Sequence, residues 1–147
     1  MEIVELINKL SILMQLYKVA SESENKKQYS EREILLLELI NTENKLSISG
    51  ISEKFPVIGK SILSSTISDF WKNGLVNKER DFENQRITNV SLTKKGQKLL
   101  ETIRKKKSER FDFLTKSLAL TLEEEKVVKI ILERAIESLD EKLTQNK

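Results

Sequence analysis

The sequence contains neither histidine nor cysteine among its 147 residues. Their absence excludes imidazole acid–base catalysis, serine and cysteine triads, thiol redox chemistry and zinc sites built on His or Cys. The carboxylates that remain form no recognisable acid–base or metal-binding spacing, and no glycine-rich loop is present that would cradle a phosphate. We therefore expect a protein that is not an enzyme and that uses no metal and no cofactor.

The positively charged side chains are concentrated in the middle of the chain. The formal net charge is only +3, but residues 60–110 contain 13 basic and 6 acidic residues, whereas residues 1–59 and 111–147 each have a net charge of −2. A basic block between two acidic ends predicts a surface that faces a polyanion such as double-stranded DNA. The alternative is a solvated helix face that binds nothing.

Apolar residues recur at helical spacing in four segments of the first half of the chain. The expected helices begin near Ile3, after Ser30, at Ile48 and at Lys60. Ser30 and Glu33 match a capping box at the start of the second helix. Residues 56–59 form a tight turn between the third and fourth helices, and Gly74 ends the fourth because glycine adopts a left-handed conformation at little cost.

After Gly74 the apolar pattern changes from the helical period to the period of two that is typical of strands. Residues 76–80 and 88–92 alternate in this way and predict a β-hairpin, whose exposed turn has Arg80 and Arg86 at its shoulders. Thr93 then caps a long helix. The sequence thus predicts a mainly α-helical protein with one small hairpin.

The order helix, tight turn, helix, glycine and hairpin is that of a winged helix-turn-helix. The region of the hairpin resembles the wing of MarR-family transcriptional regulators in Gly74-Leu75-Val76, Lys78, Arg80-Asp81, Asn84-Gln85-Arg86 and Val90-Ser91-Leu92-Thr93 leading to Gly96. The resemblance covers residues 30–100 well and the flanking helices by pattern only. We expect one domain over residues 1–147, with a winged helix-turn-helix lobe at 30–98 flanked by N- and C-terminal dimerisation helices at 1–29 and 99–147.

The resemblance implies that the wing enters the minor groove of DNA. Arg86 is the residue expected to insert there, because a narrow minor groove concentrates negative potential, and Arg80 is expected to support contacts with the DNA backbone. The family usually has Asp where this sequence has Asn84, so the charge pair that orients Arg86 is replaced by a hydrogen bond at best. Asp81 and Glu83 are alternative partners for Arg86.

The fourth helix is the candidate recognition helix. Leu63, Ile67, Phe70 and Trp71 are predicted to pack inward, which leaves a serine-rich face toward DNA. The candidate DNA-binding residues are Lys60, Ser61, Ile62, Ser64, Ser65 and Ser68 of this helix and Lys78, Arg80, Asn84 and Arg86 of the hairpin. Because this face lacks Arg, Asn and Gln, and the family often carries Arg where Ser65 stands, we expect modest direct base readout and more reliance on DNA shape and phosphate contacts.

The first and last helices carry apolar stripes that a winged helix does not need for its own core. Thr121 and Glu124 match a capping box at the start of the last helix. We expect these helices to form a homodimer, which the resemblance also implies, and which places two recognition helices on a pseudopalindromic site. The alternative is that they close a monomer.

The function that follows from these expectations is that of a MarR-type, sequence-specific DNA-binding transcriptional regulator. We expect a cytoplasmic protein, because no window contains the roughly 18 consecutive apolar residues of a membrane span. The resemblance implies that it acts as a repressor. The resemblance also implies release by a small aromatic or acidic effector; Met14, Tyr17, Trp71 and Phe111 are candidates for its pocket, although their helical spacing fits core packing as well. The competing hypothesis is a winged-helix protein-interaction module that modulates another regulator without binding DNA specifically.

Overall fold

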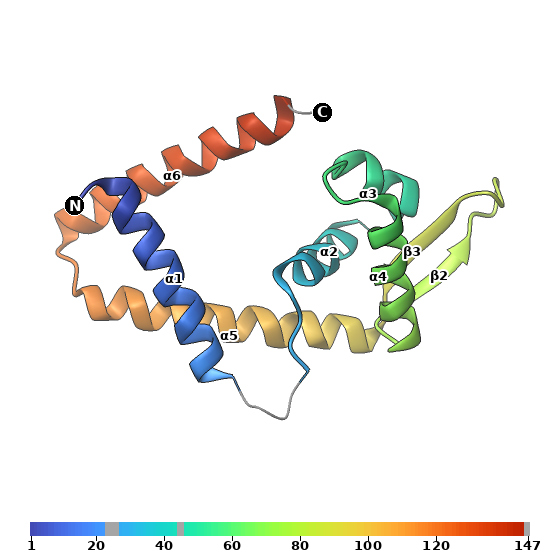
Figure 1. Ribbon diagram of the computed structural model, residues 1–147, viewed down its shortest axis with the longest axis horizontal. Helices are drawn as coiled ribbons and strands as arrows, with labels where there is room; N and C mark the ends of the chain where they lie inside the picture. Colours follow the sequence, from blue (N-terminus) through green and yellow to red (C-terminus); the bar gives the residue numbers. More distant parts are fainter. Residues whose placement is uncertain (23–26, 44–45, 146–147) are drawn as a thin grey trace. The chain divides into compact units, whose positions relative to one another are not determined.

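The computed structural model describes residues 1–22, 27–43 and 46–145 (Figure 1). These residues belong to two compact units, Met1–Ser30 and Glu31–Lys147. The described part of the first unit contains the helix α1 (Ile3–Ser21), none of whose residues is buried.

The second unit has the elements of a winged helix-turn-helix. Its described residues form α2 (Glu31–Thr42), β1 (Leu46–Ser47), α3 (Ile48–Lys54), α4 (Lys60–Lys72), β2 (Val76–Arg80), β3 (Thr88–Leu92), α5 (Lys94–Leu118) and α6 (Leu122–Gln145). The helices and both hairpin strands lie where the apolar pattern predicts them. The predicted fold class, a mainly α-helical winged helix-turn-helix with a small hairpin wing, is confirmed.

The sheet also contains β1, a strand that the apolar pattern did not predict. β1 pairs antiparallel with β3, with Leu46 opposite Val90 and Ser47 opposite Asn89, so the strand order is β1-β3-β2. A strand of two residues is too short to show a period of two and has no signature in the sequence. Its position depends on pairing with a segment more than 40 residues further along the chain.

The hydrophobic core lies in the lobe formed by α2, α3, α4, the sheet and the first turns of α5. Its buried apolar side chains are Leu36, Leu37, Ile40, Leu46, Ile51, Leu63, Ile67, Phe70, Leu75, Val76, Val90 and Leu100. Full burial of such a side chain contributes about 1.5–3 kcal/mol. Because each of these elements supplies at least one of them, the core fixes α4 and the base of the hairpin relative to each other.

The C-terminal end of α4 turns sharply into β2. Gly74 has a left-handed φ of 72°. Its N–H donates to the carbonyl of Trp71 at 3.0 Å, and the N–H of Leu75 donates to the carbonyl of Phe70 at 2.9 Å. These two bonds form a Schellman motif, so Gly74 ends the helix as predicted.

The helix α5 begins against this turn. Thr93 caps α5 by accepting the N–H of Gly96 on its Oγ1 at 3.0 Å, and the same hydroxyl donates to the carbonyl of Gly74 at 2.6 Å. The N–H of Thr93 donates to the carbonyl of Leu75 at 3.0 Å. Gly96 approaches the same carbonyl so closely that an added Cβ would lie 2.1 Å from its oxygen. The first turn of α5 therefore requires glycine at this position.

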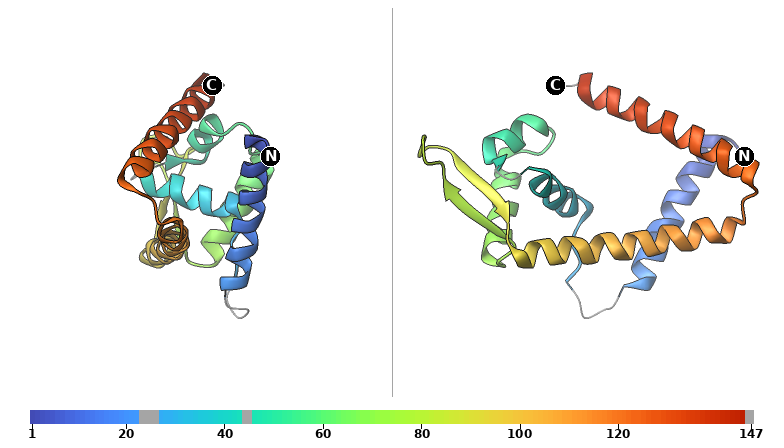
Figure 2. Two further views of the ribbon diagram at one scale, coloured as in Figure 1. Left: turned by 90° about the vertical axis from the view of Figure 1, so that its left-hand side faces the viewer. Right: turned by 180° about the vertical axis from the view of Figure 1, so that it is seen from behind.

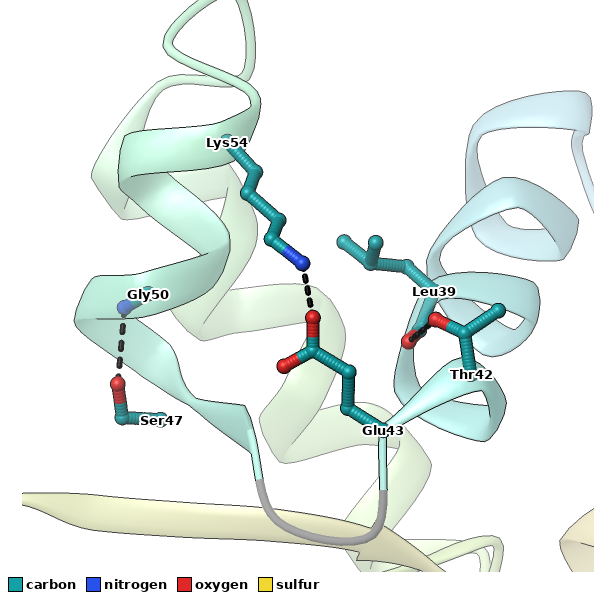
Figure 3. A network of polar contacts seen from close by, with 6 residues as sticks. All are labelled: Leu39, Thr42, Glu43, Ser47, Gly50 and Lys54. Carbon is teal, nitrogen blue, oxygen red and sulfur yellow. Dashed lines mark hydrogen bonds and ion pairs between the residues drawn. The ribbon is translucent and has the colours of Figure 1, made fainter.

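The end of α2 is connected to α3 by polar contacts (Figure 3). Ser47 caps α3 by accepting the N–H of Gly50 on its Oγ at 2.9 Å. Lys54, in the last turn of α3, forms an ion pair with Glu43. Both side chains of this pair are partly exposed, so the pair contributes little free energy.

A bidentate ion pair joins α2 to α5. Arg104 donates from Nε to Oε1 of Glu38 at 2.8 Å and from a second guanidinium nitrogen to Oε2. The hydrogen bond from Arg104 lowers the pKa of Glu38 below its ordinary value. Since folding favours the ionised carboxylate, the pair stabilises the fold above the ordinary carboxyl pKa, and this contribution is lost as the pH falls through the lowered pKa.

The last helix leaves its apolar side uncovered. α6 begins at the predicted capping box, in which the N–H of Thr121 donates to Oε2 of Glu124 at 2.8 Å and the N–H of Glu124 donates to Oγ1 of Thr121 at 3.2 Å. Every residue from Thr121 to Thr144 is exposed, including Ile131 and Leu139 of the apolar stripe. The stripe confirms the predicted amphipathic pattern and lies outside the core of the lobe.

Replacement of Gly96 by alanine should destabilise the lobe. The added methyl group meets the backbone oxygen of Leu75, which cannot move without disturbing the Schellman motif, and such overpacking typically costs about 1–3 kcal/mol. Urea unfolding measures the change. Gln97→Ala, at the exposed neighbouring position of the same helix, is the control and should stay within about 0.5 kcal/mol of the native protein. A Gly96→Ala variant as stable as the control would contradict the close approach.

Replacement of Glu38 by glutamine should reduce stability in a pH-dependent way. The expected loss near neutral pH is at most about 1 kcal/mol, because the pair is partly exposed. The difference from the native protein should shrink as the pH falls through the lowered pKa of Glu38, where the native carboxylate also becomes neutral. Urea unfolding at both pH values checks this, with the exposed Glu53→Gln as control. An equal loss at both pH values would show that the ionised carboxylate is not the stabilising group.

Candidate nucleic-acid interface

The helix α4 has a buried side and an exposed side rich in hydroxyl groups. Leu63, Ile67 and Phe70 are buried in the core. The residues that share the exposed side are Lys60, Ser61, Ile62, Ser64 and Ser65. Serine hydroxyls donate and accept hydrogen bonds and can reach phosphates or base edges of either type. The structure thus leaves these five predicted contact residues accessible.

Ser68 and Lys78, two further predicted contact residues, contact each other. The Nζ of Lys78 donates to the Oγ of Ser68 at 3.3 Å and lies 5.6 Å from the centre of the Trp71 ring. Both Ser68 and Lys78 are half-buried. The ammonium group is therefore shared between a hydroxyl and an aromatic face, and it connects β2 of the wing to α4.

The predicted inward packing of Trp71 is wrong. Its side chain is 54% exposed, whereas Leu63, Ile67 and Phe70 are at most 2% exposed. Those three residues follow each other at intervals of three and four and form one stripe, and Trp71 lies at the edge of that stripe. Its ring meets Lys78 of the neighbouring strand instead of the core.

The wing is a regular two-stranded hairpin beside α4, and its tip projects from the lobe (Figures 1 and 2). The strands β2 and β3 are antiparallel, from Val76 opposite Leu92 at the base to Arg80 opposite Thr88 near the tip. The N–H of Asp81 donates to the carbonyl of Ile87 at 2.9 Å and continues the pairing beyond the strands. The hairpin therefore holds residues 82–86 as a short, closed tip.

The carboxylate of Asp81 organises this tip. Its Oδ2 accepts the N–H of Glu83 at 3.2 Å and that of Asn84 at 3.1 Å, and its Oδ1 accepts Nδ2 of Asn89 at 3.0 Å. The Oδ1 of Asn84 in turn accepts the N–H of Arg86 at 3.1 Å. Asn84 thus bonds the backbone of Arg86, so the tip is held by local hydrogen bonds.

The side chains of Arg80, Asn84 and Arg86 are exposed, as is that of Phe82 at the tip. Guanidinium groups on a rigid hairpin lose little conformational freedom when they bind phosphates or enter a groove. Phe82 was not among the predicted contact residues. The only sequence signal for it is an aromatic residue within an otherwise polar turn.

The four candidate effector residues lie on three helices. Met14 and Tyr17 are on α1 in the first unit, and Trp71 and Phe111 are on α4 and α5 in the second. Trp71 contacts Lys78, and Phe111 is 48% exposed. Their grouping into one effector pocket stays a prediction.

The described residues contain no cluster of three or more Asp or Glu side chains placed to hold a metal ion. Within the same part of the chain, no helix combines the length and apolar character needed to cross a membrane.

Solved structures of known transcriptional regulators share this architecture. FabT of Streptococcus pneumoniae, solved in complex with DNA, is 15% identical, with a TM-score of 0.73 and coverage of 93% of this chain and 94% of its own. A MepR mutant from S. aureus is 18% identical, with a TM-score of 0.76 and coverage of 95% and 99%. PcaV of Streptomyces coelicolor, in complex with its natural ligand, is 17% identical, with a TM-score of 0.62 and coverage of 94% of each chain. This chain has the MarR-type winged-helix fold.

The likeness to MarR-type regulators lies in the fold. No protein-family model matches the sequence, and no curated protein matches it. In this MarR-type fold, α4 stands in the position of the recognition helix and the β2–β3 hairpin in that of the wing. The exposed hydroxyls of α4 and the arginines of the hairpin therefore lie on the two elements with which a winged helix contacts DNA.

Replacement of Asp81 by alanine should loosen the wing tip without unfolding the lobe. The tip loses an acceptor for three donors, and the amide protons of Glu83 and Asn84 should exchange faster with solvent. Hydrogen exchange monitored by NMR measures this. The control is Glu83→Ala, which removes the same charge from an exposed neighbouring position. Unchanged protection of these amides in Asp81→Ala would mean that Asp81 does not hold the tip.

Proposed function

We propose that this protein is a sequence-specific DNA-binding transcriptional regulator of the MarR type. The observation that supports this most is the hydrogen-bonded hairpin that carries Arg80 at the end of β2 and Arg86 in the tip, both exposed, next to a helix with a hydroxyl-rich exposed side. The same fold occurs in FabT, which was solved in complex with DNA. Two observations thus support the same function: a protein of this fold was solved with DNA, and the exposed hydroxyl and guanidinium groups of this chain suit phosphates and grooves.

The proposed contacts divide between the two grooves. Lys60, Ser61, Ile62, Ser64 and Ser65 face the major groove, where Lys60 bonds a phosphate or a base and Ile62 packs on a thymine methyl group. In the wing, Arg86 enters the minor groove, Arg80 contacts the backbone and Asn84 orients Arg86.

Ser68 and Lys78 have a different proposed role. Because they bond to each other between α4 and β2, they fix the angle between the recognition helix and the wing. They are positioning residues that act through the elements they join, and their own contacts with DNA are secondary.

The regulator acts as a homodimer on a pseudopalindromic site in this proposal. The uncovered apolar stripe of α6 and the exposed apolar residues of α1 supply the surface for a second copy. We further propose that it is a cytoplasmic repressor released by a small aromatic or acidic effector; the solved complex of PcaV with its natural ligand shows that a protein of this fold takes a ligand.

A second candidate function is a protein-interaction module that modulates another regulator. The observation that favours it is the exposed side of α4, on which Lys60 is the single charged residue among the five predicted contacts. Such a face provides few groups for specific base readout.

Binding of the duplex upstream of the protein's own gene tests the proposal. Fluorescence anisotropy at two salt concentrations should show tighter binding than to a scrambled duplex of equal length, and a steep loss of affinity as salt rises, because phosphate contacts release counterions. Equal weak binding to both duplexes would favour the interaction module.

Replacement of Arg86 by alanine should weaken this binding about tenfold or more and reduce its salt dependence, since one cationic contact is lost. The control is Arg32→Ala, which removes the same charge from an exposed position at the start of α2 and should bind like the native protein. Size-exclusion chromatography should show the same oligomeric state for both variants. Native affinity in Arg86→Ala would show that the wing assignment is wrong.

A further inference from the structure

The tip of the wing presents an apolar ring to solvent. Phe82 is 99% exposed, more than any other large apolar side chain of the lobe. Single exposed apolar residues are common on protein surfaces, so exposure alone does not indicate a function. The hydrogen-bonded backbone beside Phe82 and its charged neighbours are what distinguish it from such residues.

The backbone on both sides of Phe82 is fixed. Asp81 precedes it and accepts the N–H groups of Glu83 and Asn84, so Phe82 lies within a hydrogen-bonded turn. The second oxygen of Asp81 is held by Asn89 of β3. A ring on a fixed turn can enter a groove with a small loss of conformational freedom, which favours binding.

Charged residues surround Phe82 in the sequence of the hairpin. Arg80 precedes the tip and Arg86 lies within it, and both are exposed, but Glu79 and Glu83 are exposed in the same hairpin and offset part of their charge. Coulomb attraction to DNA at the tip is therefore weaker than two arginines alone would provide. An apolar contact adds affinity that does not depend on the net charge.

We propose that Phe82 is a wedge that inserts with Arg86 into the minor groove of the bound duplex. An apolar side chain flanked by arginines is the combination with which minor-groove binding proteins contact sugar walls and base steps. The ring packs against the deoxyribose walls of the groove and the base edges at its floor, while Arg86 meets the negative potential there. This inference rests on the proposed DNA binding and adds an apolar contact to it.

The salt dependence of binding distinguishes the wedge from a cationic contact. An apolar contact releases no phosphate counterions, so its loss lowers affinity at every salt concentration by the same factor. Phe82→Ala should bind about five- to thirtyfold more weakly with an unchanged slope of log K against log salt, as expected for loss of a partly buried Phe contact. Arg86→Ala should reduce the slope as well as the affinity.

The experiment uses the full chain and a duplex that the native protein selects from a random-sequence pool. Native protein, Phe82→Ala, Phe82→Leu and Arg86→Ala are titrated by fluorescence anisotropy over a range of salt concentrations. Phe82→Leu keeps an apolar side chain and should bind within about threefold of the native protein. Because Phe82 is 99% exposed, the urea midpoint of each Phe82 variant should equal that of the native protein.

The outcomes separate the wedge from the proposed function. Native affinity in Phe82→Ala together with weakened binding in Arg86→Ala overturns the wedge and leaves the DNA-binding function intact. A change of oligomeric state in Phe82→Ala at native affinity, measured by sedimentation, assigns the ring to a protein contact and also overturns the wedge. Failure of the native protein to enrich any duplex from the pool overturns the proposed function and the wedge with it.

Discussion

The contact between the first turn of α5 and the carbonyl of Leu75 determines how α4 and the hairpin, the two candidate DNA-binding elements, are arranged. Gly96 lies against this carbonyl, and the hydroxyl of Thr93 bonds the carbonyl of Gly74 directly before it. α4 therefore ends, the wing begins and α5 starts at one point. Glycine at positions 74 and 96 permits this meeting, the first through its left-handed backbone and the second through its missing Cβ.

The two candidate DNA-binding elements, the wing and α4, offer different kinds of contact. In the wing, Asp81 and Asn84 bond the backbone of the tip, so the exposed guanidinium and aromatic groups are presented at little entropic cost. In α4 the exposed hydroxyls offer few bidentate contacts with bases. A hydrogen-bonded wing beside a helix that offers few base-specific contacts is the arrangement expected of a protein that recognises the shape of the DNA grooves more than the base edges.

The exposed apolar side chains of α1 and α6 provide a reason why the proposed dimer would be more stable than a single chain. Side chains such as Ile7 of α1 and Ile136 of α6 are 60% and 65% exposed in the single chain. Their burial between two copies releases free energy that a single lobe lacks. The stability of such a protein depends on its concentration, because association and folding are linked.

Most features that depend on neighbouring residues could be predicted from the sequence. The capping box of α6, the glycine that ends α4 and the alternation in the hairpin involve residues within about four positions of each other, and their geometry follows from local chain stereochemistry. Thr93 and Thr121 cap their helices as expected. The winged-helix order of the elements was predictable for the same reason.

Contacts between distant segments could not be predicted in this way. Arg104 bonds Glu38 across 66 positions, β1 pairs with β3, and Lys78 meets Ser68 and Trp71 across the α4–β2 corner. Burial of the whole core brings these residues together, so their separations along the chain follow no periodic pattern that the sequence could reveal. The exposure of Trp71 and the rigid presentation of Phe82 follow from that packing, so they became visible only when the chain was folded.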